Sequence, residues 1–292
     1  MGVFGLLNIC KPKGPTSHDI VATVRRGTRV KKVGHAGTLD PMASGVLVLG
    51  LGPATRLSEY VMESQKTYRA RVRLGIETDT YDAEGRIVAE NPALVERARV
   101  EGVLATFRGE FQQVPPMYSA IKIEGRKLYE IARAGAEVER TPRPVTVYRL
   151  DLTAWEPPDV EIEVVCSPGT YIRSLAFDLG RAVGVGAHLV ALERTASGLF
   201  TVENAVDWET FKLAMQDGTW QDYLLPPDMA LYQAAEVRLS VVDTLRIRQG
   251  MTIHLAETPG EIARAYDSNG QLLAVLKRRG EDWKPEKVFL AE

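Results

Sequence analysis

The chain is organised around the stretch VGHAGTLDPMASGVLVLG at residues 33–50. This stretch is a loop of glycine and small residues that leads into an apolar, strand-like run. Its glycines permit backbone angles that other residues avoid, and they allow another molecule to approach closely. Pro41 biases Asp40 towards extended backbone, which holds the carboxylate in a defined direction. Aspartate before proline is also common in Asx turns, so these residues alone leave a purely structural turn open.

Length and composition predict an ordinary globular protein of the cytoplasm. The chain has 292 residues, enough for one large or two modest domains, with 45% hydrophobic and 25% charged residues. No apolar run is long enough to cross a bilayer, and residues 1–7 lack the features of a signal peptide. Cys10 and Cys166 lie far apart in apolar, strand-like contexts, so we interpret both as reduced core residues.

Charge is unevenly distributed along the chain. The net charge of −2 argues against a uniformly basic nucleic-acid binder. Residues 11–35, however, hold seven Lys or Arg against one acid, and residues 117–149 hold seven against four. A basic face on a nearly neutral protein suits a phosphate-backbone partner, because counterion release is local. An ordinary solvated surface explains the same runs, and the counts do not decide between the two readings.

Residues 66–74 form the most informative predicted strand. Alternation places Tyr68 on one face with three apolar residues, and arginines 69, 71 and 73 on the other. The arginines suit solvent, carboxylates or phosphates. Tyr68 can be a core aromatic whose hydroxyl is satisfied. The acidic run at residues 78–85 does not fit a calcium loop and predicts a tight turn between strands.

Other local patterns predict a mixture of strands and helices. Thr16 or Ser17 caps a helix that ends near Gly27. Thr170 caps a second helix that runs to about Gly184 and places the Arg173 cation at its positive N-terminus, so an anion is expected to compensate that charge. Strands are predicted at residues 5–10, 46–51, 145–154, 160–166, 235–239, 262–266, 272–276 and 288–290. Further helices are predicted at residues 54–62, 93–107, 127–134 and 241–248.

Several of these segments together resemble the TruB family of tRNA pseudouridine synthases. The resemblance rests on a Lys-Pro-x-Gly-x-Thr-Ser opening at residues 11–17 and on Gly-Thr-Leu-Asp-Pro at residues 37–41. It extends to Lys-x-Tyr at residues 66–68 ahead of Leu-Gly-x-x-Thr-Asp-Thr-x-Asp at residues 74–82. Gly-Thr-Tyr-Ile-Arg at residues 169–173 and the run at residues 188–195 complete it.

The resemblance implies roles for particular residues. Asp40 would be the catalytic residue, Tyr68 would stack on the target base, Arg173 would pair with Asp40, and Leu192 would line the pocket. The implied substrate-binding set is Tyr68, Tyr171, Arg173, Leu192 and His35. We expect His35 to fill the space left by the displaced base, although a core histidine is equally compatible with the sequence.

The resemblance also implies the fold and the partners. We expect an α+β pseudouridine-synthase core, a mixed and mainly antiparallel sheet flanked by helices, at residues 1–231. A small β-barrel-like PUA domain that binds RNA would follow at residues 232–292. The proline-bracketed excursion at residues 117–144 would fold over the tRNA loop, as in bacterial stand-alone members, although an ordinary basic hairpin remains open. Candidate RNA contacts are Lys11, Lys31, Lys32, Lys122, Arg126, Lys127 and Arg143.

The implied reaction converts the T-loop uridine at tRNA position 55 to pseudouridine after the base is flipped out. We expect a monomer with no obligate protein partner and no membrane association. No metal is expected, because the histidines and cysteines lack ligand spacing, and no other cofactor, because the sequence has no Walker-type or dinucleotide-binding glycine motif. Two alternatives remain. A non-catalytic tRNA-binding or folding factor would use the same scaffold, and an unrelated glycosidase would need a second carboxylate facing Asp40 at about 5–10 Å.

Overall fold

The computed structural model describes residues 2–92, 94–119, 122–123, 126–128, 138–255 and 258–290. For residues 122, 123, 126 and 127 it describes the backbone alone. The predicted helix at residues 127–134 therefore lies mostly outside the described residues, as do the side chains of Lys122, Arg126 and Lys127. The described helices include none that is both long and apolar enough to cross a membrane.

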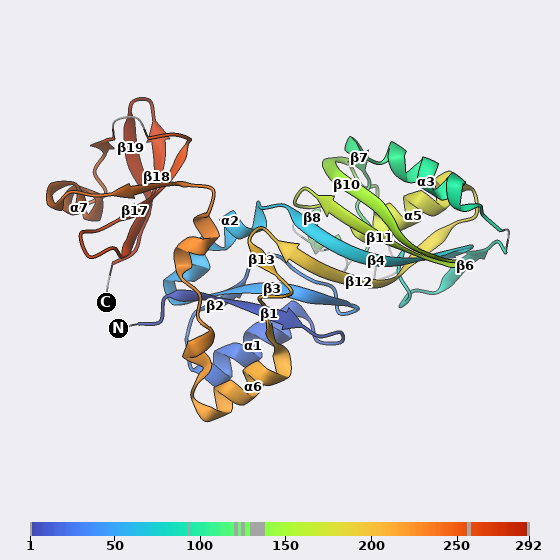
Figure 1. Cartoon of the computed structure of the whole chain (residues 1–292), viewed down its shortest axis with the longest axis horizontal. Helices are drawn as coiled ribbons and strands as arrows, with labels where there is room; N and C mark the ends of the chain where they lie inside the picture. Colours follow the sequence, from blue (N-terminus) through green and yellow to red (C-terminus); the bar gives the residue numbers. More distant parts are fainter. Residues whose placement is uncertain are drawn as a thin grey trace.

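A mixed sheet forms the centre of the larger unit (Figure 1). Its strands follow the order β14-β1-β3-β12-β4-β11-β10-β7, with β13 beside β12 and β2 beside β3. The pairs β1–β14 and β3–β12 are parallel and the other described pairs are antiparallel, which confirms the predicted mixed, mainly antiparallel sheet. The bounds are β1 (Gly5–Lys11), β2 (Val33–His35), β3 (Ala43–Leu51), β4 (Lys66–Leu74), β7 (Gly109–Gln113), β10 (Arg143–Glu156), β11 (Asp159–Cys166), β12 (Ala187–Ser197), β13 (Phe200–Thr201) and β14 (Val206–Asp207).

Helices cover both ends of this sheet. Figure 1 shows α1 and α6 side by side near β1, and α3 and α5 near the opposite end. The apolar residues of α1 and α5 enter one continuous core with the inner strands. The bounds are α1 (Ser17–Thr28), α2 (Ser58–Met62), α3 (Arg97–Thr106), α5 (Ile172–Val183) and α6 (Trp208–Asp217), with short 3₁₀ helices η1 (Gly52–Leu57), η2 (Trp220–Tyr223) and η3 (Pro227–Leu231).

The strand β4 shows why the sheet forms as the sequence predicts. Its apolar positions are buried, whereas its arginines point outwards and are paired by carboxylates of neighbouring strands. Arg73 lies 2.7 Å from Asp159 and Arg71 lies 2.8 Å from Glu161, each pair in register across β4 and β11. The predicted guanidinium ladder therefore binds carboxylates, and such cross-strand pairs add modest stability.

A second, smaller sheet forms the C-terminal unit. Its order is β15-β17-β18-β19-β16, and α7 (Val241–Arg248) packs against β16 and β19. The strands are β15 (Ala235–Arg238), β16 (Ile253–His254), β17 (Ile262–Tyr266), β18 (Leu272–Arg279) and β19 (Asp282–Val288). Two further strand pairs, β5 (Ile76–Thr78) with β6 (Ile87–Glu90) and β8 (Lys122–Ile123) with β9 (Arg126–Lys127), lie outside both sheets.

Some predicted boundaries were wrong. The last strand spans residues 282–288 rather than 288–290, because Pro285 is tolerated at an irregularity between β18 and β19. The helix predicted at residues 93–107 begins at Arg97. Several elements were not predicted at all, among them β7, β12, α6 and β16. Cys166 is buried as expected, but Cys10 is only partly buried, so it is not a core residue.

The C-terminal unit is docked on the first unit through its last strand. Phe289 stacks on Phe4 with ring centroids 4.9 Å apart, and the Arg56 guanidinium lies 5.2 Å above the Phe289 ring. Arg56 also donates a hydrogen bond to the Val288 carbonyl at 2.8 Å. Buried residues of both units form a common hydrophobic cluster, so the two units share part of their core.

We expect Phe289→Ala to lower the free energy of unfolding by about 3 kcal/mol, because the truncation leaves a cavity in this shared cluster. Phe289 is 6% exposed. Urea denaturation followed by fluorescence measures the change. The neighbouring Leu290, which is 58% exposed, supplies the matched control. Leu290→Ala should change the free energy by less than about 0.5 kcal/mol, and equal losses in the two variants would contradict this docking.

Candidate active site

The loop that carries Asp40 connects β2 to β3 and is tied to the fold by its backbone. Gly14 donates a main-chain hydrogen bond to the Pro41 carbonyl at 2.8 Å. The Ala43 amide donates to the carbonyl of Asp40 itself at 3.0 Å, which closes a tight turn. Gly45, the third residue of β3, has a φ of +99°, a conformation that suits glycine.

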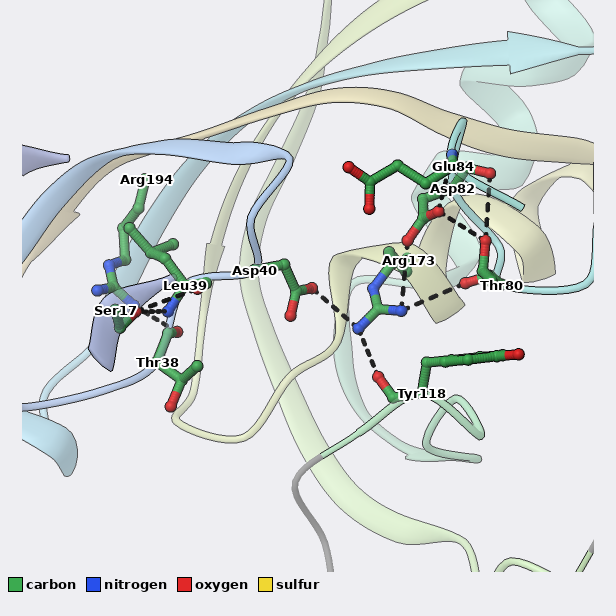
Figure 2. Close-up of polar contacts among 10 residues, drawn as sticks. All are labelled: Ser17, Thr38, Leu39, Asp40, Thr80, Asp82, Glu84, Tyr118, Arg173 and Arg194. Atoms are coloured by element: carbon green, nitrogen blue, oxygen red, sulfur yellow. Dashed lines mark hydrogen bonds and ion pairs between the residues drawn. The ribbon is translucent and has the colours of Figure 1, made fainter. Parts of the chain in front are cut away.

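Ser17 clamps the residue that precedes Asp40. Its hydroxyl accepts a hydrogen bond from the Leu39 amide at 2.9 Å and donates to the Leu39 carbonyl at 3.1 Å (Figure 2). Ser17 is free for this role because Thr16 caps α1, in a capping box with Asp19. Of the two caps predicted from the sequence, Thr16 is therefore the correct one. The first turn of α1 fixes the chain beside the carboxylate.

Asp40 forms an ion pair with Arg173. The distance between Asp40 Oδ2 and Arg173 Nη2 is 2.9 Å. The Arg173 side chain is 6% exposed and that of Asp40 is 38% exposed, so a buried cation holds a carboxylate that still faces solvent. The predicted pair is confirmed, and Asp40 supplies an anion for the arginine at the helix N-terminus. The geometry leaves the carboxylate fixed and accessible.

Arg173 has a second carboxylate, which sequence reasoning missed. Asp82 Oδ2 lies 3.4 Å from Arg173 Nη1, and the Asp82 side chain is 7% exposed. The guanidinium also donates to the carbonyls of Tyr118 at 2.8 Å and Thr80 at 3.3 Å. Figure 2 shows the guanidinium between the two acids. The sequence signal for a second acid was the positive charge of Arg173 in the first turn of a helix. One partly exposed anion compensates a cation at the positive end of a helix only in part.

The turn that carries Asp82 lies between β5 and β6, as predicted. Asp82 accepts hydrogen bonds from the Thr80 hydroxyl at 2.6 Å and the Glu84 amide at 3.1 Å. Tyr81 has a φ of +64°, unusual for a residue with a bulky side chain, and stacks on Phe177 of α5 with centroids 4.0 Å apart. This stacking holds the turn against the same helix that presents Arg173.

The start of α5 differs from the predicted one. Tyr171, not Thr170, is the N-cap residue, and its side chain makes no capping hydrogen bond. Gln113 of β7 instead binds the Tyr171 main chain, accepting from its amide at 2.8 Å and donating to its carbonyl at 3.0 Å. The Thr170 hydroxyl donates to the Ser167 carbonyl. The predicted Thr170 cap was wrong, because the helix begins one residue later and the Thr170 hydroxyl is bound to Ser167 instead.

Both predicted tyrosines lie within electrostatic range of Asp40. Burial raises the pKa of Tyr68 and that of Tyr171, and the negative charge of Asp40 raises both further. Leu192, which is buried, lies opposite Ala43 where β12 pairs with β3, at the end of the Asp40 loop. The structure thus brings the acid, both phenols, the guanidinium and the leucine to one region.

His35 lies on β2 and is largely enclosed. Its ring contacts that of His18 edge to face, with centroids 5.1 Å apart, and its Nδ1 is buried without a hydrogen-bond partner among the described residues. Burial, together with the nearby His18 and Arg194, lowers the pKa of His35 to about 4. His35 is therefore neutral in the folded protein at neutral pH.

This shift predicts how stability depends on pH. The folded pKa of about 4 lies below the ordinary value of 6.5, so the unfolded chain binds more protons between these values. The contribution of His35 is complete above pH 6.5 and is lost as the pH falls towards 4. We expect a loss of about 2 kcal/mol in urea unfolding between pH 7 and pH 4.5, and a smaller loss in His35→Gln. An equal loss in the variant would contradict the burial of an uncharged ring.

The predicted RNA contacts are only partly placed by the structure. Lys31, Lys32 and Arg143 are exposed. Lys11, in contrast, is fully buried, and its Nζ donates to the carbonyls of Pro12 and Pro15 at 2.9 and 2.8 Å. Burial lowers the pKa of Lys11 to about 8, while the charge of Asp40 acts in the opposite direction. The prediction that Lys11 contacts RNA is wrong, because its amino group is engaged inside the protein.

The side chain that faces Asp40 is an arginine, which argues against the glycosidase alternative. Two glycosidase carboxylates must face each other across the substrate. Arg173 lies next to Asp40 here, and the second acid, Asp82, is buried on the other side of the guanidinium. Within the described part of the chain, no group of three His, Cys, Asp or Glu side chains is arranged to hold a metal ion.

Comparison with family models shows the family of this chain. The model of the N-terminal domain of TruB family pseudouridylate synthases matches residues 25–172. The chain belongs to the TruB family. The model of the C-terminal domain of tRNA pseudouridylate synthase B matches residues 173–232. These TruB matches confirm the family that the sequence motifs predicted.

Individual TruB relatives extend over nearly the whole chain. The tRNA pseudouridine synthase B of Dehalococcoides mccartyi strain BAV1 is 43% identical over 99% of this chain and 97% of its own. That of Streptococcus pneumoniae is 41% identical over 98% and 99%. Among solved structures, a chain from a Cbf5–Nop10–Gar1 complex has a TM-score of 0.76 at 28% identity, covering 98% of this chain and 85% of that one. A chain from an H/ACA ribonucleoprotein bound to a substrate RNA containing 2′-deoxyuridine has a TM-score of 0.75 at 26% identity, covering 99% and 86%.

Proposed function

We propose that this chain converts the T-loop uridine at position 55 of tRNA to pseudouridine, with Asp40 as the essential catalytic residue. That the chain is an isomerase acting on tRNA follows from its family and from nearly full-length relatives with that activity at 41–43% identity. One observation supports the role of Asp40 above the others. Its carboxylate is 38% exposed, lies 2.9 Å from a buried guanidinium, and has two tyrosines nearby.

The reaction needs no redox change. The bond between ribose C1′ and uracil N1 breaks, a bond between C1′ and C5 forms, C5 loses a proton and N1 gains one. An ionised carboxylate suits this sequence, as a nucleophile towards the sugar or the ring and as an acceptor of the C5 proton. Arg173 keeps the carboxylate oriented and compensates its charge when RNA excludes water.

The target base must leave the T-loop stack to reach Asp40. Flipping costs a few kcal/mol, and stacking on the Tyr68 ring returns about 1–3 kcal/mol of that cost. Leu192 lines the apolar side of the same pocket, and Tyr171 packs at the start of α5 beside Arg173. His35, neutral and edge-on to His18, is suited to occupy the gap that the base leaves in the loop.

The remaining parts of the chain serve to hold the RNA. We assign residues 1–231 to the catalytic domain and residues 232–292 to a PUA-like RNA-binding domain. The exposed Lys31, Lys32 and Arg143 contact phosphates. The excursion predicted at residues 117–144, part of which lies outside the described residues, would fold over the tRNA loop. The enzyme acts as a monomer without an obligate protein partner, in the cytoplasm where tRNA is modified.

Incubation of the purified chain with an unmodified tRNA transcript, followed by pseudouridine mapping, tests this function. We expect one product, at position 55. Salt-sensitive binding of the transcript without any pseudouridine would overturn the assignment and favour a tRNA-binding or folding factor on the same scaffold. Product at other positions alone would retain the enzyme class and overturn the T-loop target.

A further inference from the structure

Arg194 of β12 is among the most completely buried charged side chains of the described residues, with 2% exposure. Its donors point to main-chain carbonyl oxygens. Nε donates to Val46 at 2.8 Å, Nη2 to Gly37 at 3.1 Å and Nη1 to Thr38 at 3.3 Å. Figure 2 shows Arg194 and Arg173 on opposite sides of Asp40.

The position of these carbonyls gives Arg194 a specific target. Gly37 and Thr38 lie three and two residues before Asp40, and Val46 lies six residues after it. The guanidinium therefore joins both arms of the loop that carries the carboxylate. The main chain of β3 also packs closely against the main chain of Arg194, because a Cβ on Gly45 would lie 2.3 Å from the Arg194 carbonyl oxygen. Any shift of Arg194 moves the support of that loop.

A buried arginine with this set of partners is costly. None of the ion pairs within 4 Å among the described residues includes Arg194. Burial of a charge without an opposite charge is unfavourable, and an apolar side chain of similar volume would avoid this cost. What an apolar residue cannot supply is a rigid, planar fork of donors for three separate carbonyls. The fork, rather than the bulk, is the property that this site uses.

We propose that Arg194 is a positioning residue for pseudouridine formation, because its buried guanidinium fixes the main chain that aims Asp40 at the substrate. This inference rests on the proposed role of Asp40. The two arginines divide the work. Arg173 binds the carboxylate, and Arg194 binds the backbone on either side of it without touching the RNA. Tyr68 lies opposite Arg194 where β4 pairs with β12. Burial raises the pKa of Tyr68 and a side-chain hydrogen bond with Arg194 opposes that shift, so the arginine also contacts the stacking platform.

Arg194→Lys tests the inference, because lysine retains the charge but cannot reach three carbonyls with a fixed fork. Misplacement of a catalytic group by about 1 Å costs about 10²-fold in rate, so we expect kcat to fall by roughly that factor. The KM for unmodified tRNA transcript should change by less than about twofold, because RNA-contacting surfaces are intact. Replacement of a purely structural residue would lower the amount of folded enzyme. It would not lower kcat at an unchanged KM in the molecules that fold.

Arg108→Lys is the matched control. The Arg108 guanidinium also donates to a main-chain carbonyl, that of Leu150, at 2.8 and 3.1 Å, but on β10 away from Asp40. We expect its kcat and KM to equal those of the wild type.

Three results would overturn the inference. The first is an unchanged kcat in Arg194→Lys, and the second is a raised KM with unchanged kcat. The third is failure of both Arg194→Lys and the neutral variant Arg194→Gln to fold, which would show that Arg194 serves the whole fold rather than the loop. Inactivity of the wild-type chain on the transcript would instead refute the proposed function, so the two failures are distinguishable.

Discussion

Asp40→Asn will abolish pseudouridine formation and leave the fold and the RNA binding intact. Asparagine has nearly the shape of aspartate, and its side-chain oxygen can still accept the hydrogen bond from Arg173 Nη2, 2.9 Å away in the wild type. It can neither attack the nucleoside nor accept the C5 proton effectively. We therefore expect the rate to fall by about 10⁴-fold or more. Pseudouridine mapping, filter binding of the transcript and thermal unfolding together measure the three properties.

Asp159→Asn provides the control for this variant. Asp159 also pairs with an arginine, Arg73 at 2.7 Å, but on the outer face of β4 and β11. Its replacement should weaken a surface ion pair, at a cost below about 1 kcal/mol, and leave the reaction rate unchanged. If Asp40→Asn and Asp159→Asn had the same activity, Asp40 would have no catalytic role.

Arg173→Met will both destabilise the protein and inactivate it. The substitution leaves two carboxylates without their cation, and Asp82 is 7% exposed, so its charge is stranded in the interior. The loss of one partner from a buried pair costs about 3–5 kcal/mol, and we expect a decrease of that size in urea unfolding at pH 7. Activity should also be lost, because the Asp40 carboxylate then lacks the guanidinium that binds and orients it.

The double variant Arg173→Met/Asp82→Asn separates these two effects. Removal of the stranded charge should restore most of the lost stability, because an amide can keep the hydrogen bond with Thr80 without a buried charge. Activity should remain absent, since Asp40 still lacks its guanidinium. A single variant as stable as the wild type, or a double variant that makes pseudouridine, would contradict the proposed network.

The elements that the sequence predicted well are those with a clear local period. In β4, alternation separates buried apolar residues from paired arginines, and the structure follows this pattern over residues 69–74. The Asp40 loop was recognisable because glycine and proline constrain its backbone locally, and because its residues match those of a known family. Its pair with Arg173 was implied by the family resemblance and not by any local pattern.

The features that the sequence did not predict depend on tertiary contacts. Asp82 lies in a run that is equally typical of an exposed turn, and only the arrival of Arg173 from α5 makes it part of the site. Arg194 lies on a strand where a charged residue suggests an outward face, yet it is buried under the Asp40 loop. Gln113 and Tyr171 are 58 residues apart, so no local capping rule connects them.

The most direct test of the central claim is a single-turnover measurement on transcript with tritium at C5 of its uridines. Enzyme in excess over RNA removes effects of product release, and each isomerisation frees one tritium from C5. Our account predicts that wild-type protein releases the label of one uridine per transcript, whereas Asp40→Asn, at a concentration where it binds the RNA equally, releases none above the level without enzyme. Release by Asp40→Asn at the wild-type rate would contradict the claim that this carboxylate performs the reaction.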